Sequence, residues 1–217
     1  MQCDFAPYSV NLVRWIKLDE TSGSTATDSS SNSNGSYVNA TLGKPGVFGT
    51  SVSFNGATTK INSMGVPVTG SAARSEAAWI KTSNYSNFQI ISSYGSTSDG
   101  EIFRWELNTA GKLKLNTKSQ GYGACDIVVA TNKWVHVAVT MPSGGAGLKL
   151  YVNGVQCGDS VNVTLNTGSG KGIHMGRSPW SGFSGRNFGG NIDDFRFYDI
   201  ELSAEQIRDL YEQGSYQ

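Results

Sequence analysis

The 217-residue sequence predicts an all-β fold, an antiparallel β-sandwich (jelly roll) with a short C-terminal helix. The first observation is that apolar and polar side chains alternate along many short segments, as in strands with one face on a core. The second is that turn dipeptides such as Asn34-Gly35 and Asn153-Gly154 separate these segments in a chain with 27 glycines. The length fits one domain over residues 1–217, with a core at about residues 10–214.

Charge and hydropathy argue against two classes of partner. The formal net charge is zero and only 16% of the residues are charged, without a basic stripe, so nucleic acid is a poor candidate. No stretch approaches 18 consecutive apolar residues, so no membrane-spanning helix is expected. Residues 1–7 contain neither a basic residue nor an apolar run and do not have the pattern of a signal peptide.

The alternation is clearest in five segments: residues 103–107, 112–116, 135–140, 148–152 and 195–198. The segment at residues 148–152 is followed by the strongest hairpin signal in the sequence. Asn153-Gly154 suits a two-residue type I′ turn, and this register pairs Val152 with Val155 and Leu150 with Cys157. Cys157 is therefore expected to point inward with the leucines.

The three cysteines, Cys3, Cys125 and Cys157, fit no zinc motif. Along residues 125–129, Cys125 shares a face with Ile127 and Val129, so Cys125 and Cys157 are both expected to face inward. Two interpretations follow. The pair forms a disulfide, or the two residues are small buried thiols that behave as apolar side chains.

One helix is expected, at the end of the chain. Residues 203–206, Ser-Ala-Glu-Gln, have the capping-box pattern. Ile207, Leu210 and Tyr211 follow at helical spacing, and Gly214 is the expected stop.

Several segments, taken in order, resemble the concanavalin A-like lectin/glucanase superfamily and, within it, the bacterial laminin G-like group. They are residues 15–20 and 28–35, Ser53-Phe54-Asn55-Gly56, residues 78–81, 134–140 and 151–154, and residues 190–199 followed by the helix. The resemblance spans roughly residues 10–214 and implies two stacked antiparallel sheets, one of them concave. It also implies a core containing the side chains of Trp15, Phe54, Trp79, Trp134 and Phe195.

The resemblance further implies one structural calcium ion between an early aspartate loop and the late Gly-Asn-Ile-Asp-Asp segment. Asp28 and Asp193 are the expected ligands, with Asp19 and Asn32 as secondary candidates. Calcium takes six to eight oxygen ligands, which polar loops can supply. The alternative is that Asp28 caps a turn and that Asp193 and Asp194 accept hydrogen bonds from loop amides.

A carbohydrate surface is predicted around the loop at residues 178–188. Trp180 and Phe183 lie there among glycines and serines, and Tyr122 and Tyr94 have similar surroundings. Aromatic rings beside polar groups suit the apolar faces and hydroxyls of sugars. Alternatively, Trp180 packs inward as a plug of the loop.

Charged side chains of a neighbouring strand extend this surface. Arg104 and Glu106 face away from Phe103 and Trp105, and on a concave sheet they would line the hollow beside Asn116. The alternative is a solvated ion pair between Arg104 and Glu106.

Catalysis is not expected. Glucanases of this superfamily place Glu-x-Asp-x-x-Glu on one strand, with carboxylates on one face. Residues 101–106 lack the central aspartate, and Glu101 and Glu106 fall on opposite faces.

The sequence therefore predicts a non-catalytic, lectin-like module that binds a glycan or polysaccharide. Its expected location is extracellular, on a cell surface or on a virion. An adhesive module that binds a protein partner or another copy of itself is the alternative, and a glycoside hydrolase is the second alternative.

Overall fold

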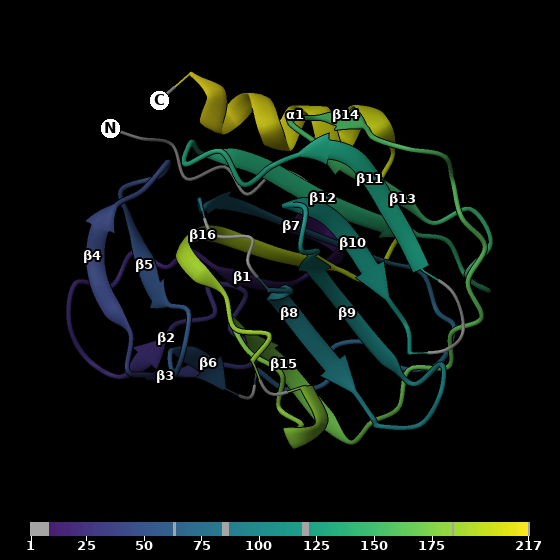
Figure 1. Ribbon diagram of the computed structural model, residues 1–217, viewed down its shortest axis with the longest axis horizontal. Helices are drawn as coiled ribbons and strands as arrows, with labels where there is room; N and C mark the ends of the chain where they lie inside the picture. The colour runs from purple at the N-terminus through teal and green to yellow at the C-terminus, as the bar shows by residue number, and fades with distance from the viewer. Residues whose placement is uncertain (1–8, 63, 84–86, 119–121, 184, 217) are drawn as a thin grey trace.

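The computed structural model describes residues 9–62, 64–83, 87–118, 122–183 and 185–216, and of Tyr122 only the backbone. Two antiparallel sheets form a sandwich, and one helix lies on its outside (Figure 1). The prediction of an all-β sandwich with a short C-terminal helix is confirmed.

Sheet A carries the helix and contains the long central strands. In spatial order it consists of β14 (Val155–Gln156), β13 (Lys149–Val152), β12 (Val135–Met141), β7 (Arg74–Lys81), β16 (Gly189–Tyr198), β5 (Thr50–Asn55) and β4 (Thr41–Pro45). β1 (Leu12–Ile16) pairs with β16 as well. The predicted hairpin is confirmed, because Val152 pairs with Val155 and the Cys157 amide donates to the Leu150 carbonyl.

Sheet B faces sheet A across the core. Its order is β11 (Tyr122–Val128), β10 (Lys112–Asn116), β9 (Ile102–Leu107), β8 (Gln89–Gly95), β15 (Lys171–Met175), β6 (Lys60–Asn62), β3 (Gly35–Val38) and β2 (Thr25–Ala26). Two short 3-10 turns, η1 (Ser9–Asn11) and η2 (Ser181–Phe183), lie outside the sheets.

The main core fills the space between the sheets. Phe103, Trp105 and Leu107 of β9 meet Phe195 and Phe197 of β16 there, all of them fully buried. Burial of such large apolar side chains contributes roughly 1.5–3 kcal/mol each. The alternation read along residues 103–107 and 195–198 therefore marks the inward faces of one strand from each sheet.

Helix α1 (Ala204–Ser215) begins at the predicted capping box. The Gln206 amide donates to Ser203 Oγ and the Ser203 amide donates to Gln206 Oε1. Ile207 and Leu210 lie against the outer face of sheet A in a second, smaller apolar cluster. The expected stop at Gly214 is wrong, because Gly214 lies within the helix and a Cβ there would be 2.6 Å from the Trp79 ring.

Three of the five aromatic residues expected in the core lie elsewhere. Trp79 is buried, but it points away from the main core and contacts His136 and Tyr211 beneath α1. Trp15 and Trp134 are only partly buried. The outer face of sheet A is covered by α1, so an aromatic side chain of this sheet can be buried without belonging to the main core.

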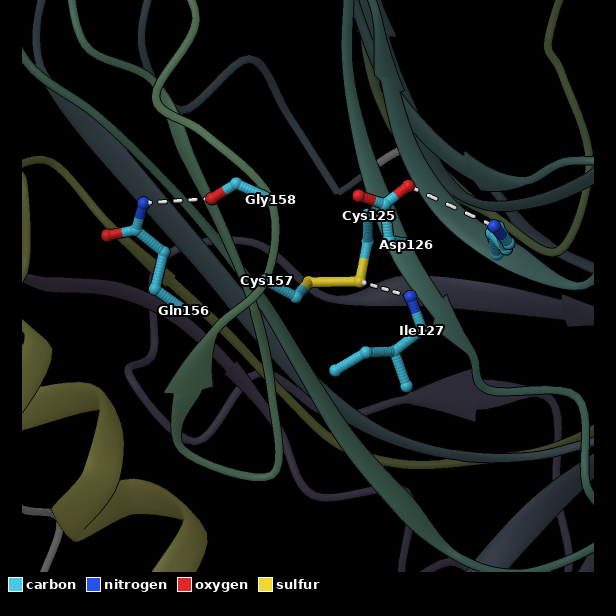
Figure 2. The surroundings of a disulfide bond; sticks show 7 residues. Cys125, Asp126, Ile127, Gln156, Cys157 and Gly158 are labelled. Carbon is cyan, nitrogen blue, oxygen red and sulfur yellow. Dashed lines mark hydrogen bonds and ion pairs between the residues drawn. A yellow bond between two sulfur atoms is a disulfide. The ribbon is translucent and has the colours of Figure 1, made fainter.

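A disulfide joins Cys125 and Cys157, with Cα atoms 5.1 Å apart (Figure 2). Cys125 lies on β11 and Cys157 directly follows β14, so the bond links the two edge strands that close the same side of the sandwich. Ile127 was expected to share the inward face of Cys125, but it is 46% exposed. The β10–β11 pairing shifts register between Lys112 and Lys114, which interrupts the alternation on β11.

Among the residues described, no helix is both long and apolar enough to cross a bilayer.

Candidate functional site

The loop predicted to contact sugar follows β15 and folds back over the outer face of sheet B. The Trp180 amide donates to Ser178 Oγ at 3.2 Å, which turns the chain before η2. Further along, the Ile90 amide donates to the Arg186 carbonyl at 3.3 Å, so the end of the loop is bound to β8. The loop is thereby attached to the sheet at its far end as well as through β15.

Trp180 and Phe183 face each other on this loop, with ring centroids 6.4 Å apart and the rings nearly perpendicular. Both side chains are partly buried, so Trp180 is neither fully exposed nor a buried plug. Beside them lies a groove of about 570 Å³ whose opposite wall contains Lys118 and Thr97. The structure thus combines aromatic rings, a cation and hydroxyl groups around one hollow.

Lys118 fixes the opposite wall of the groove. Its Nζ atom donates to the Thr97 carbonyl and lies 3.3 Å from Asp99 Oδ1. These contacts join the end of β10 to the loop between β8 and β9. Sequence reasoning missed Lys118 and Thr97, because nothing in their local pattern indicates that the loop at residues 178–188 lies opposite them.

Arg104 and Glu106 point to the outer face of β9, as predicted, but they are buried there, with 1% and 0% of their surface exposed. Arg104 Nε lies 3.1 Å from Glu106 Oε2, and Arg186 Nη1 lies 3.1 Å from Glu106 Oε1. The two residues do form an ion pair, but the alternative of a solvated pair is wrong because both side chains are buried. The loop covers the pair and adds a second guanidinium, Arg186, that the sequence analysis did not single out as a site residue.

The two guanidinium groups also support the aromatic rings. The Arg104 guanidinium carbon lies 4.2 Å from the centroid of Phe183, and that of Arg186 lies 4.2 Å from the centroid of Phe88. Burial lowers the pKa of Arg104, while Glu106 opposes this shift. Cations over ring faces are attracted electrostatically, which holds Phe183 in place beside the groove.

The other three predicted contacts, Tyr94, Asn116 and Tyr122, have different outcomes. Tyr94 is fully buried in the core, where its hydroxyl accepts from Arg74 Nη1 at 2.6 Å, so the predicted ligand contact of Tyr94 is wrong. Asn116 pairs with Arg104 across β10 and β9, and its Oδ1 accepts from the Lys118 amide. The Tyr122 side chain lies outside the described residues. A register shift in the β8–β9 pairing between Ile90 and Ser92 changes which face Tyr94 occupies.

Asp28 is held by hydrogen bonds from its own loop and from β1. The amides of Trp15 and Ser30 donate to Oδ1 at 2.9 Å, and the Ser33 amide donates to Oδ2 at 3.0 Å. Arg14 Nε lies 3.8 Å from Oδ2. This is the turn-capping arrangement that was the alternative to a metal ligand.

Asp193 occupies a different environment, beneath the turn between β4 and β5. The amides of Val47 and Phe48 donate to its Oδ2 at 2.6 and 3.0 Å. The secondary candidates are also engaged, because Asp19 Oδ1 accepts from the Thr50 amide and Asn32 Nδ2 donates to the Val13 carbonyl.

The four predicted ligands therefore do not form one calcium cluster. Within the described part of the chain, no group of three or more His, Cys, Asp or Glu side chains is arranged to hold a metal ion. A cation at Asp28 would displace amide hydrogen bonds and lie beside the Arg14 guanidinium. The hydrogen bonds of these residues favour the turn-capping interpretation, and calcium binding is not tested by this arrangement.

A calcium titration tests this arrangement directly. We expect the thermal unfolding midpoint to be the same within about 1 °C in excess EDTA and in millimolar calcium. Calcium at a hundredfold excess over its dissociation constant would instead raise the midpoint by about 5–10 °C. Such a rise, lost in Asp193→Asn but kept in the exposed control Asp159→Asn, would support the metal site.

Comparisons with known proteins agree with this architecture. A laminin G family model, described as the concanavalin A-like lectin/glucanases superfamily, matches residues 55–208. No curated protein sequence matches the chain significantly.

Solved structures with similar folds share little sequence with the chain. Domain 4 of AbnA, an extracellular arabinanase from Geobacillus stearothermophilus solved with arabinotriose, has a TM-score of 0.64 at 19% identity, covering 93% of this chain and 98% of that domain. Trypanosoma rangeli sialidase, solved with sialic acid, has a TM-score of 0.70 at 16% identity over 93% of this chain and 33% of its own.

A botulinum neurotoxin type C structure, described as dependent on two ganglioside molecules for cell entry, has a TM-score of 0.68 at 16% identity. The match covers 96% of this chain and 52% of the toxin chain. The chain thus spans the whole of the arabinanase domain, but only about a third of the sialidase and half of the toxin structure.

Proposed function

Because the chain belongs to the concanavalin A-like lectin/glucanases superfamily, we propose that it is a non-catalytic carbohydrate-binding domain whose ligand lies in the groove beside Trp180. The observation that carries this proposal is the pair of rings, Trp180 and Phe183, at the wall of that groove. Its volume of about 570 Å³ falls within the range of small-molecule sites, roughly 300–1,000 Å³.

The chemistry of the groove suits a saccharide. Sugar rings present apolar faces that pack on aromatic rings, and Trp180 and Phe183 supply such rings. Hydroxyl groups need donors and acceptors, which Lys118, Thr97 and Ser181 offer around the same hollow. The Arg104 guanidinium already holds Phe183 in place, so little side-chain freedom is lost when a ligand binds.

The environment of Glu106 supports a non-catalytic role. A glycosidase needs two accessible carboxyl groups on either side of the scissile bond. Glu106 is fully buried and ion-paired with both Arg104 and Arg186. It is therefore a structural anchor for the loop rather than a proton donor or nucleophile.

The structural neighbours give independent support for glycans as the class of ligand. One was solved with arabinotriose, one with sialic acid, and a third depends on gangliosides for cell entry. The arabinanase is extracellular. We place this domain likewise outside the cell or on a cell or virion surface, where such glycans occur.

Replacement of Trp180 tests the proposal. In affinity gel electrophoresis with a panel of soluble polysaccharides that includes arabinan, we expect the wild-type protein to be retarded by at least one of them. Trp180→Ala should weaken that binding at least about tenfold, equivalent to about 1.4 kcal/mol, because the ring loses its stacking contact.

The matched control is Val155→Ala, which removes a 65% exposed apolar side chain on β14, an edge strand of the other sheet. This variant should bind as the wild type does. If Trp180→Ala and wild type bind with equal affinity, the polysaccharide binds elsewhere on the protein. A protein that binds no polysaccharide on the panel, but self-associates through the Trp180 loop, would favour the adhesive alternative.

A further inference from the structure

A second pocket lies on the opposite side of the molecule, on the outer face of sheet A. It measures about 330 Å³ and lies between the C-terminal end of α1 and the turn that joins β4 to β5. Trp79, Trp134 and Tyr211 provide aromatic walls, and Val47 and Asn153 lie at its edges. Figure 1 shows α1 above the strands of sheet A.

Trp79, a wall of this pocket, is the middle member of a row of three side chains in register across sheet A. Asp193 of β16 pairs with Trp79 of β7, and Trp79 pairs with His136 of β12. The Trp79 ring lies 5.3 Å from the His136 ring and 5.7 Å from that of Tyr211. The sheet itself therefore fixes the positions of these groups.

Each member of this row has a buried polar atom without a hydrogen-bond partner among the described residues. These atoms are Trp79 Nε1, His136 Nδ1 and Asp193 Oδ1. An unsatisfied buried polar group costs roughly 1–3 kcal/mol. Of these three residues Trp79 lines the pocket, so its indole N–H is the group that a bound molecule would satisfy. By contrast, Trp105 Nε1, in the core between the sheets, does have a partner, Ser92 Oγ.

The residues that line the pocket carry no charged side chain. Behind the Trp79 ring, burial and the nearby Arg196 lower the pKa of His136 to about 3, so this ring is neutral at physiological pH.

The walls are held in place. A Cβ on Gly214 would lie 2.6 Å from the Trp79 ring, so the helix rests directly on that side chain. Asn153 Oδ1 accepts from the His136 amide at 3.0 Å, and the Asn153 amide donates to the His136 carbonyl at 2.8 Å. The pocket is thus built from a helix, a strand row and a tight turn.

We infer that this pocket is a second ligand site, independent of the Trp180 groove, which takes a single neutral sugar residue such as the end of a glycan. Its volume suits one ring rather than a chain. An aromatic cage could also accept a quaternary ammonium group. A quaternary ammonium, however, cannot accept a hydrogen bond from Trp79 Nε1, whereas the oxygen of a sugar hydroxyl can.

Titration of the ¹⁵N-labelled protein tests this inference. The probes are D-glucose, D-galactose and L-arabinose, each followed through the indole N–H resonance of Trp79. We expect at least one sugar to shift this resonance saturably, with a dissociation constant on the order of 1 mM. No saturable shift with any sugar, or a saturable shift only with tetramethylammonium, would overturn the inference.

Two variants locate the binding. Trp134→Ala removes a wall, and Ser215→Tyr fills the pocket from its rim without removing a core contact. Each should weaken the sugar at least about fivefold, equivalent to about 1 kcal/mol. Glu205→Gln, exposed at the opposite end of α1, is the control and should bind as the wild type does. Unchanged affinity in a folded Ser215→Tyr protein would contradict the site.

Trp180→Ala distinguishes this site from the groove. The shift of the Trp79 resonance should be the same in Trp180→Ala and wild type, because the two pockets lie on opposite sheets. If Trp180→Ala removes the shift, the sugar binds only in the groove and the second site is refuted. If the shift persists while polysaccharide retardation is absent from the wild type, the second site stands and the groove proposal fails.

Discussion

The Glu76→Gln variant is expected to gain stability relative to the wild type as the pH rises. Glu76 lies inside the sandwich on β7, fully buried, where its Oε2 accepts from Ser92 Oγ. Its Oε1 has no partner among the described residues. Burial raises the pKa of Glu76 to about 8, although Ser92, Trp105 and the charge of Arg74 oppose this shift.

The sign of the change in stability follows from the raised pKa of Glu76. A carboxyl group whose pKa is raised by folding contributes its full stability below its unfolded value of 4.5, and this contribution is lost as the pH rises through about 8. The amide side chain that replaces Glu76 in the variant does not titrate. The difference in free energy of unfolding between Glu76→Gln and wild type should therefore shift by about 4 kcal/mol in favour of the variant between pH 5 and pH 9.

Urea denaturation at the two pH values measures this shift. Asp193 has a raised pKa too, but it titrates in both proteins, so its effect cancels in the comparison. Asp159→Asn, an exposed loop substitution, is the control and should stay parallel to the wild type. A constant difference between Glu76→Gln and wild type across this range would show that Glu76 is already ionised in the folded protein.

Loss of the disulfide is expected to destabilise the protein by about 3–4 kcal/mol, because a bond that closes a loop of this length restricts the unfolded chain. The two cysteines are 32 residues apart in sequence, and the bond joins the edges of both sheets (Figure 2). The doubly substituted Cys125→Ser, Cys157→Ser protein should show this loss in urea denaturation under oxidising conditions.

Treatment with a reductant separates the effect of losing the disulfide from the effect of replacing the two cysteine side chains. A reductant should lower the stability of the wild type and of Cys3→Ser by similar amounts, and leave the double variant unchanged. Cys3 lies outside the described residues and serves only as a control for a free thiol. Identical stability of wild type and double variant under oxidising conditions would mean that the bond does not form in solution.

Local patterns were sufficient for several elements of the fold. The hairpin at Asn153-Gly154 and the capping box at Ser203 depend on contacts within a few residues, so both follow from the sequence. The inward faces of β9 and β16 follow from simple alternation. Alternation failed on β11, where a register shift left Ile127 exposed. The surroundings of Tyr94 in the sequence were also misleading, because this residue lies on β8 and is fully buried in the core.

Local patterns predicted only one side of the candidate site. Trp180 and Phe183 were recognisable because aromatic residues among glycines and serines have no strand to bury them. Their partners across the groove, Lys118 and Thr97, depend on how three separate segments meet. The burial of Arg104 and Glu106 likewise depends on where the loop folds, which no local pattern records.

By itself, the sequence determined the class of fold, the C-terminal helix, the family and the aromatic loop, because each depends on short-range periodicity, turn chemistry or the order of motifs. Only the tertiary structure decided what covers each face of the two sheets. That covering turned Arg104 and Glu106 into a buried anchor, placed Trp79 and His136 beneath α1, and kept Asp28 apart from Asp193. These outcomes depend on contacts between residues far apart in the chain, and they arise only when the sandwich has formed.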